Sequence, residues 1–238
     1  MPNVPNIQPD PLLPEYRWNQ AAGRYIGPNG QFVSQITIRG ELDKALDNVT
    51  DRLVSLSRDF RTGVIDGRTF QVESMSLIKQ AHLLGGALEK GGWQNMTQSD
   101  FGRIGQIIRQ EYGWFNNLVK QLESGQQRLD GTLDSRMRLY GQAGRGTYHK
   151  FERESRAIQG YDEERSILHG RDNCKASKRP GCIDEAARGW QPIGTITPVG
   201  SRTCLSNCRC STSFRRSSTG EVVSVSYTHL RAHETVLD

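Results

Sequence analysis

The spacing of apolar residues between positions 34 and 168 limits the fold of this chain more than any other feature. Apolar side chains recur there in steps of three and four residues, which is the period of an amphipathic helix. Glycine-containing segments separate the runs, as expected where helices end. The expected fold class is therefore mainly α, with a helical bundle over residues 35–170. We predict helices over about residues 34–62, 66–90, 97–125 and 132–168.

Polar and charged residues within these runs indicate where a helix starts and which helix face is exposed. Thr97 is followed three residues later by Asp100, a capping-box pattern with an acid in place of the usual Glu. The charged run KFERESR, residues 150–156, is expected to be a solvated face of the fourth helix. His82 and His149 have no Cys-His or carboxylate partner at ligand spacing, so we interpret them as packing or surface residues.

The segment GQAGRG, residues 141–146, has the glycine content of a phosphate-binding loop. However, no predicted strand precedes it, and no Lys-Ser or Lys-Thr pair follows it. Glycine within a helix costs about 1 kcal/mol relative to alanine, so each such glycine needs a structural reason. We expect close helix packing at Gly102, Gly105, Gly113 and Gly144.

The N-terminal 34 residues differ from the helical runs. The first sixteen positions contain five prolines, which remove backbone donors and fix φ, so we expect residues 1–15 to be a disordered arm. An extended arm that holds a neighbouring subunit is the alternative. In residues 16–34, Tyr25-Ile26 and Phe32-Val33 lie on either side of Gly-Pro-Asn-Gly. This pattern predicts a small β-hairpin.

The composition excludes several classes of protein. The chain has 35% apolar and 24% charged residues, as soluble proteins do, and no run of 18 apolar residues. Its first thirty residues lack the features of a secretory signal, so we expect it to stay in the cytosol where it is made. It also lacks a nucleophile elbow, a His-Glu-x-x-His helix and a recognisable pair of catalytic carboxylates. We therefore expect a non-enzymatic protein.

All five cysteines lie between positions 174 and 210, on either side of the turn-rich segment GWQPIGTITPVG. In a reducing compartment, close cysteines more often bind a metal than form disulfides. A structural zinc ion held by four thiolates would stabilise a small β/loop module over residues 171–216. Unligated thiols, or disulfides Cys174–Cys182 and Cys204–Cys208 formed by oxidation, are the alternatives. The candidate ligands are Cys174, Cys182, Cys204 and Cys208, with Cys210 or His169 as substitutes.

The same part of the chain is basic. Residues 165–216 contain ten Lys or Arg and three Asp or Glu, a formal charge of +7, whereas the whole chain carries +5. Such a surface suits phosphate groups or an acidic protein, and a role in solubility alone is the alternative. Without a groove-reading helix, contact with nucleic acid should be non-specific. The predicted contact residues are Arg202, Arg209, Arg215 and Arg216.

Three segments between Arg136 and Arg215 carry a family resemblance: RMRLYGQAGRGTYH, GYDEERSILHG and EAARGWQPIGTITPVGSRTCLSNCRC. Together they resemble the tailed-phage head-morphogenesis proteins, the Mu F-like minor capsid family. Members of this family look similar to one another in their order of parts: a helical region is followed by a short cysteine-bearing module. That module ends in Asn-Cys-Arg-Cys or Asn-Cys-Lys-Cys and an extended strand. Here, Asn207 to Cys210 are followed by STSFRR.

The resemblance implies a low-copy virion component that is associated with the portal vertex and acts in capsid assembly, DNA packaging or DNA delivery. The implied partners are the portal protein, other capsid or scaffold proteins and, non-specifically, packaged DNA. The implied location is the virion, and the host bacterial cytoplasm during assembly. We expect no membrane partner and no small-molecule substrate. The alternative function is that of a zinc-stabilised nucleic-acid-binding module.

Residues 217–238 are expected to be a disordered tail. Within it, residues 225–238 resemble translated sequencing-adapter read-through, a recurrent contaminant of metagenomic assemblies. We therefore expect the natural C terminus to differ from the one printed. His229 and His233 lie four residues apart beside Glu234, but they have no third ligand or continuous apolar face, so we predict no metal site there.

Overall fold

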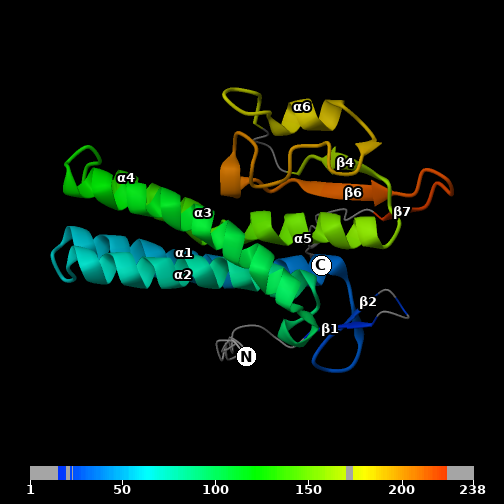
Figure 1. Cartoon of the computed structure of the whole chain (residues 1–238), viewed down its shortest axis with the longest axis horizontal. Coiled ribbons are helices and arrows are strands. Elements are labelled where there is room, and N and C mark those ends of the chain that lie inside the picture. Colours follow the sequence, from blue (N-terminus) through cyan, green and yellow to red (C-terminus); the bar gives the residue numbers. More distant parts are fainter. Residues whose placement is uncertain (1–15, 20–21, 23, 170–173, 224–238) are drawn as a thin grey trace, which may run out of the picture.

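The computed structural model describes residues 16–19, 22, 24–169 and 174–223, so the predicted arm at 1–15 and the adapter-like residues 225–238 lie outside the described residues. The described chain is mainly helical, which confirms the predicted fold class (Figure 1). Its helices are α1 (Gln35–Arg61), α2 (Gly67–Glu89), α3 (Gln98–Glu123), α4 (Gly131–Gly141), α5 (Gly144–Ile158) and α6 (Cys182–Ala187), with short 3-10 turns η1 (Trp93–Asn95) and η2 (Leu205–Asn207).

The first three predicted helices are confirmed, and polar side chains cap their starts. At α1, the Ser34 hydroxyl accepts a hydrogen bond from the backbone N–H of Thr37 at 3.1 Å. At α3, Thr97 N–H donates to the Asp100 carboxylate at 2.8 Å, and Asp100 N–H donates to the Thr97 hydroxyl at 3.2 Å. This is the predicted capping box. It satisfies N–H groups that have no acceptor within the helix.

The fourth predicted helix, 132–168, is wrong. The chain forms α4, breaks at Gln142-Ala143, forms α5 and then turns at Gly160, where φ is +85°. After this turn, β4 (Glu163–Ile167) pairs antiparallel with β6 (Ser211–Arg215). Because β6 comes much later in the chain, the local spacing of apolar residues carries no information about this pairing.

Two small sheets accompany the helices. Near the N terminus, β2 (Arg24–Ile26) and β3 (Phe32–Val33) form the predicted hairpin, and β1 (Arg17–Asn19) adds a third strand. The second sheet has the strand order β5 (Gln191–Pro192), β4, β6, β7 (Val222–Val223). Because β7 pairs with β6, the prediction of a disordered tail over 217–238 is wrong for this part.

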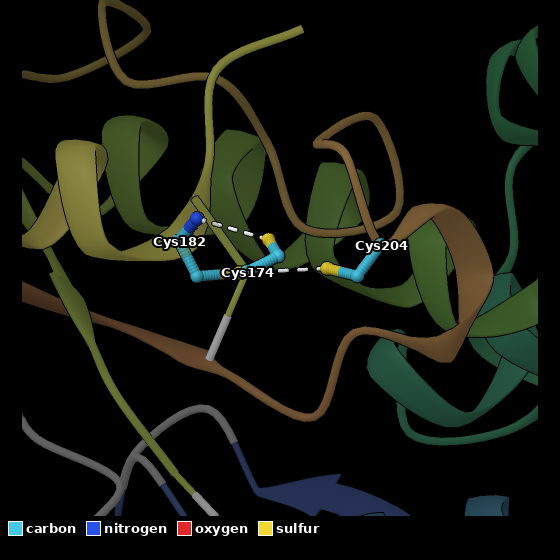
Figure 2. Close-up of side chains that lie close together, drawn as sticks. All are labelled: Cys174, Cys182 and Cys204. Atoms are coloured by element: carbon cyan, nitrogen blue, oxygen red, sulfur yellow. Dashed lines mark hydrogen bonds between the residues drawn. The ribbon is translucent and has the colours of Figure 1, made fainter. Parts of the chain in front are cut away.

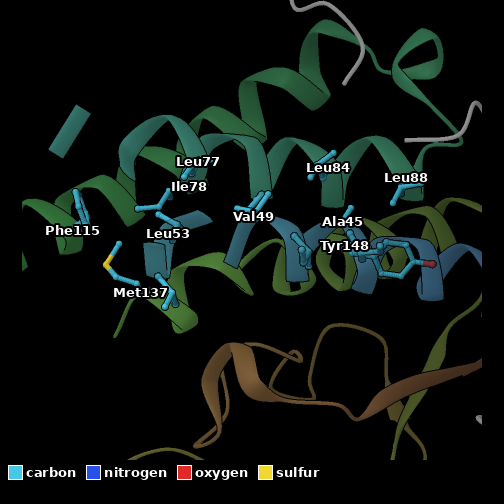
Figure 3. Close-up of a cluster of buried hydrophobic side chains, with 14 of the residues drawn as sticks. Ala45, Val49, Leu53, Leu77, Ile78, Leu84, Leu88, Phe115, Met137 and Tyr148 are labelled. Atoms are coloured by element: carbon cyan, nitrogen blue, oxygen red, sulfur yellow. The ribbon is translucent and has the colours of Figure 1, made fainter. Parts of the chain in front are cut away.

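The main core lies between α1, α2, α4 and the end of α3, with Tyr148 of α5 at its edge (Figure 3). α1 packs against α2 and α4, while α2 also packs against α3 and α5. The ring of Phe70 stacks on Phe60 with centroids 4.8 Å apart and also contacts Phe115. The apolar stripe of α1 faces this core, as its spacing predicts. Its buried residues include Leu42, Leu46, Val49 and Leu53.

Two glycines allow the backbones of α2 and α5 to touch. A Cβ atom on Gly144 would lie 2.1 Å from the carbonyl oxygen of Ala81, and one on Gly85 would lie 2.1 Å from that of Gly144. No side chain fits in either place, which confirms close packing at Gly144. The same prediction is wrong for the α3 glycines. There, no described heavy atom outside the helix backbone lies within 4 Å of an added Cβ on Gly102, Gly105 or Gly113.

The charged run 150–156 is not the solvated face that we predicted, because Glu152 is buried. Its carboxylate accepts two hydrogen bonds from Arg39 of α1, at 2.6 and 2.8 Å, and lies 3.0 Å from Nδ1 of His149. Burial opposes the charged form of Glu152, but Arg39 and His149 hold its pKa at about 2. His149 therefore has a carboxylate neighbour, and both it and His82 are buried packing residues.

A second buried carboxyl group, that of Glu89, lies at the end of α2. Burial raises the pKa of Glu89 to about 7, although Lys90 and a hydrogen bond from Ser155 favour its charged form. The Tyr25 hydroxyl donates to the backbone carbonyl of Glu89 at 2.5 Å. The N-terminal sheet therefore contacts the helices at a residue whose charge changes near neutral pH.

Gly144→Ala should destabilise the fold by about 3 kcal/mol, because the added methyl group meets a backbone carbonyl that cannot move aside. Gly105→Ala is the matched control. It should stabilise the fold by about 1 kcal/mol, because α3 has open space there and alanine favours a helix. Urea unfolding of both variants measures this difference. Equal effects at the two positions would contradict the packing that we describe.

Glu89→Gln should change how stability depends on pH. A carboxyl pKa that is higher in the folded state contributes stability below about pH 4.5, and this contribution is lost as the pH rises through about 7. Relative to the unsubstituted protein, the variant should therefore gain about 3 kcal/mol between pH 5 and pH 8. Denaturant unfolding at both pH values measures the gain. Glu73→Gln, at an exposed position of α2, is the control, and an identical response in both variants would refute the assignment.

Candidate metal centre

Three segments of the C-terminal module bring its five cysteines together. Cys182 begins α6, Cys204 and Cys208 lie on either side of η2, and Cys210 directly precedes β6. Cys174 comes from the loop before α6. Figure 2 shows Cys174, Cys182 and Cys204 converging, with the Cys174 sulfur close to the start of α6.

A close approach of the chain to itself at Gly181 places Cys174 beside Cys182. A Cβ atom on Gly181 would lie 2.5 Å from the Cys174 carbonyl oxygen, so a larger residue would separate the two segments. The Cys182 N–H donates to the Cys174 sulfur at 3.1 Å. The third segment is held to this loop by Thr203, whose N–H donates to the Pro180 carbonyl at 3.1 Å.

The sulfur atoms lie at the spacing of ligands around one ion. Sγ of Cys182 is 3.5 Å from Sγ of Cys204 and 3.4 Å from Sγ of Cys208. A tetrahedral ion with bonds of ~2.3 Å to sulfur would hold its ligands roughly 3.8 Å apart. Cys182 belongs to both close groups of thiols, so the cluster could hold a metal ion with this residue at its centre. The groups are Cys174, Cys182, Cys204 and Cys182, Cys208, Cys210.

The cluster favours one thiolate surrounded by thiols. Hydrogen bonds from Cys204, Cys208 and Cys210 hold the pKa of Cys182 well below its usual range. Its neighbours respond in the opposite direction: the hydrogen bond to Cys182 raises the pKa of Cys204 to about 12, and the pKa values of Cys208 and Cys210 also rise. A bound cation would displace the shared protons and hold several thiolates together.

All five cysteines that we predicted as candidate ligands lie in this cluster, but the substitute His169 does not. Neither close group of possible ligands includes His169. Its Nε2 instead lies 2.7 Å from the hydroxyl oxygen of Ser211 in β6.

Besides its cysteines, the module buries few apolar side chains, among them Ile196, Val199 and Phe214. Its apolar cluster consists of Val199 and the five cysteines. A cluster of this size gives little hydrophobic stabilisation, so a metal ion would contribute much of the energy that holds these loops.

Arg202 is not a surface contact, which corrects our prediction. It is fully buried, with its Nε donating to the Thr197 carbonyl at 2.9 Å and Nη1 donating to the Ser166 hydroxyl at 2.7 Å. Arg202 thus ties the loop before the last cysteines to β4. The sequence shows its charge but not the acceptors that the fold places around it.

The other predicted contact residues have partners within the protein. Arg215 donates to Glu163 at 2.6 Å, and Arg216 donates to Glu221. Arg209 lies 3.6 Å from a carboxylate oxygen of Asp43 in α1, and its side chain is 55% exposed. Of the four predicted arginines, Arg209 is therefore the most available to a partner.

A loop that we did not select carries exposed positive charge beside the cysteines. Lys175, Lys178 and Arg179 are exposed, and none has an ion pair among the described residues. The signal was present in the sequence as KASKRP, where three cations have no acid between them.

Side chains of α5 fasten the module to the helices. Arg145 donates to the Ser206 carbonyl of η2 at 3.0 Å, and the Ser206 hydroxyl donates to the Leu139 carbonyl of α4 at 2.6 Å. Further along α5, Arg153 lies 2.8 Å from Glu164 of β4 and donates to the Ile196 carbonyl at 2.7 Å. The turn that carries Cys204 and Cys208 thus rests directly on α4 and α5.

No protein-family model, curated protein or solved structure matches this chain. Among the residues that the structure describes, no helix has the length and apolar character needed to cross a membrane.

Proposed function

We propose that this chain is a non-enzymatic minor head protein of a tailed phage, associated with the portal and acting in capsid assembly or in DNA packaging and delivery. The observation that carries the proposal is the position of the Asn-Cys-Arg-Cys element. It supplies Cys208 and Cys210 to the thiol cluster and leads directly into β6. A helical region, a cysteine module and a terminal strand in this order support the resemblance stated above.

We further propose that the module binds one structural Zn²⁺ through Cys174, Cys182, Cys204 and Cys208. Zinc suits a closed set of four thiolates, which leaves no open position for chemistry. Cys204 interacts with the other three thiols of this set. Cys210 interacts with Cys182 and Cys208, on the other side of the cluster. We therefore propose Cys210 as the fifth thiol, outside the ligand set, although its sulfur also lies in a close group with those of Cys182 and Cys208.

The alternative function, a zinc-stabilised nucleic-acid-binding module, is favoured by the exposed loop beside the cluster. Lys175, Lys178 and Arg209 have exposed side chains on this module, and lysine and arginine bind phosphate without regard to sequence. In the minor head protein, the same charges would face packaged DNA. The two functions differ in whether the protein enters capsids.

Protein purified under reducing conditions should contain about one zinc ion per chain. Cys208→Ser should lose the zinc and expose residues 174–210 to protease while the helices survive. Cys210→Ser is the matched control, and it should retain the metal. Elemental analysis and limited proteolysis measure these outcomes. Near-zero zinc in the unsubstituted protein, or equal loss from both variants, would refute the proposed ligand set.

Co-expression with the capsid, scaffold and portal proteins of the same phage genome should place this protein in procapsids. Lys175→Glu/Lys178→Glu should leave incorporation intact but reduce DNA retention or delivery, because these exposed cations would then repel phosphate. Lys79→Glu/Lys120→Glu is the charge-matched control on exposed positions of α2 and α3. Immunoblots of purified capsids and the DNA content per particle measure both effects.

Absence of the protein from capsids that contain the native portal would contradict the minor-head function. If the purified protein also bound DNA tightly, with an affinity that falls steeply as salt increases, the nucleic-acid-binding function would replace it.

A further inference from the structure

A hollow of about 530 Å³ separates α3 from α4, α5 and the cysteine module. α3 lines it between Ile107 and Gln121, and α4 and α5 line it between Arg136 and Lys150. Arg179 and Leu205 of η2 also line it, on the side of the cysteine module. The hollow therefore lies where the helical region meets the module, and the proposed zinc site does not account for it.

The lining residues show that the hollow is a long groove. On both walls they recur in steps of three and four over fifteen positions. Along α3 this corresponds to four turns, or about 21 Å. A small ligand is enclosed by a compact cavity, whereas two helical walls of this length match the docking of a third helix.

Apolar side chains line part of this groove. Trp114 of α3 is 49% exposed, although it is large and apolar. Ile107 lies two turns before it, and Tyr140 lies on the opposite wall. A helix with one apolar stripe would cover these residues, and an aromatic anchor of this kind commonly provides much of the energy of such an interface.

Positive charge surrounds the apolar part. Arg136, Lys150 and Arg179 line the groove, and Glu111 is the acidic residue among the lining positions. Burial raises the pKa of Glu111 to about 7, against the attraction of Lys150, so its negative charge is partly lost near neutral pH. The groove therefore presents a net positive surface to its occupant.

We propose that this groove binds an amphipathic helix of a partner protein, about four turns long, with an apolar stripe flanked by acidic residues. Charge complementarity favours a separate acidic partner over a second copy of this chain, whose net charge is +5. The inference rests on the proposed function only for the identity of the partner. Binding of the helix requires neither capsids nor DNA.

A displayed library of sixteen-residue helical peptides, selected against the purified full-length chain, tests this inference. Enriched peptides should have apolar residues at helical spacing with acidic neighbours. Trp114→Asp and Arg136→Glu should each weaken their binding at least tenfold. Val72→Asp, at an exposed apolar position of α2, and Arg138→Glu, at an exposed position of α4, are the matched controls and should bind as the unsubstituted protein does. Thermal melts establish that each variant is folded.

Three results would overturn the inference: no enriched peptide, enriched peptides without acidic residues, or binding that Arg136→Glu leaves unchanged. Arg136→Glu keeps the test decisive if Trp114→Asp does not fold. Sedimentation of the same proteins tests the other occupant, since an oligomer that only the groove variants dissociate would assign the groove to a second copy. Failure of peptide binding together with normal entry into capsids would refute this inference and leave the proposed function standing.

Discussion

The contact between the backbones of α2 and α5 determines where the rest of the molecule can lie. With glycine at positions 85 and 144, α5 lies directly against α2, and its remaining faces stay available to other elements. One face buries Glu152 against Arg39 of α1, while Arg145 and Arg153 extend towards the cysteine module. A single helix therefore joins the apolar bundle to a module that has a much smaller apolar core.

The two halves of the protein are held by different kinds of interaction. The helical bundle is stabilised by apolar burial, whereas the module depends on buried polar contacts and clustered thiols. Arg202 is the clearest example, because a fully buried guanidinium joins loops that have few side chains to pack together. Several arginines of the module thus interact with groups of the same protein, whereas Lys175 and Lys178 are exposed at the surface.

The parts of the fold that could be predicted are those encoded by neighbouring residues. Helical spacing identified the core face of α1, and Thr97 with Asp100 marked the start of α3, because both signals depend on positions a few residues apart. β4 was missed because its partner strand is remote in sequence. The cysteines could be grouped from their number and proximity, but the burial of Arg202 depends on acceptors that only the folded loops bring together. Likewise, the spacing of apolar residues does not distinguish the crowded Gly144 from the open Gly105.

The distribution of the cysteines along the chain determines when the cluster can assemble. A nascent chain that has emerged only as far as α6 exposes Cys174 and Cys182, while Cys204 and Cys208 have yet to leave the ribosome. The helices, built from local contacts, can form during this interval. Capture of a metal would therefore follow the formation of the helices that precede the cysteines, and the supply of the ion and the redox state of the cell at that moment would decide how many modules are completed.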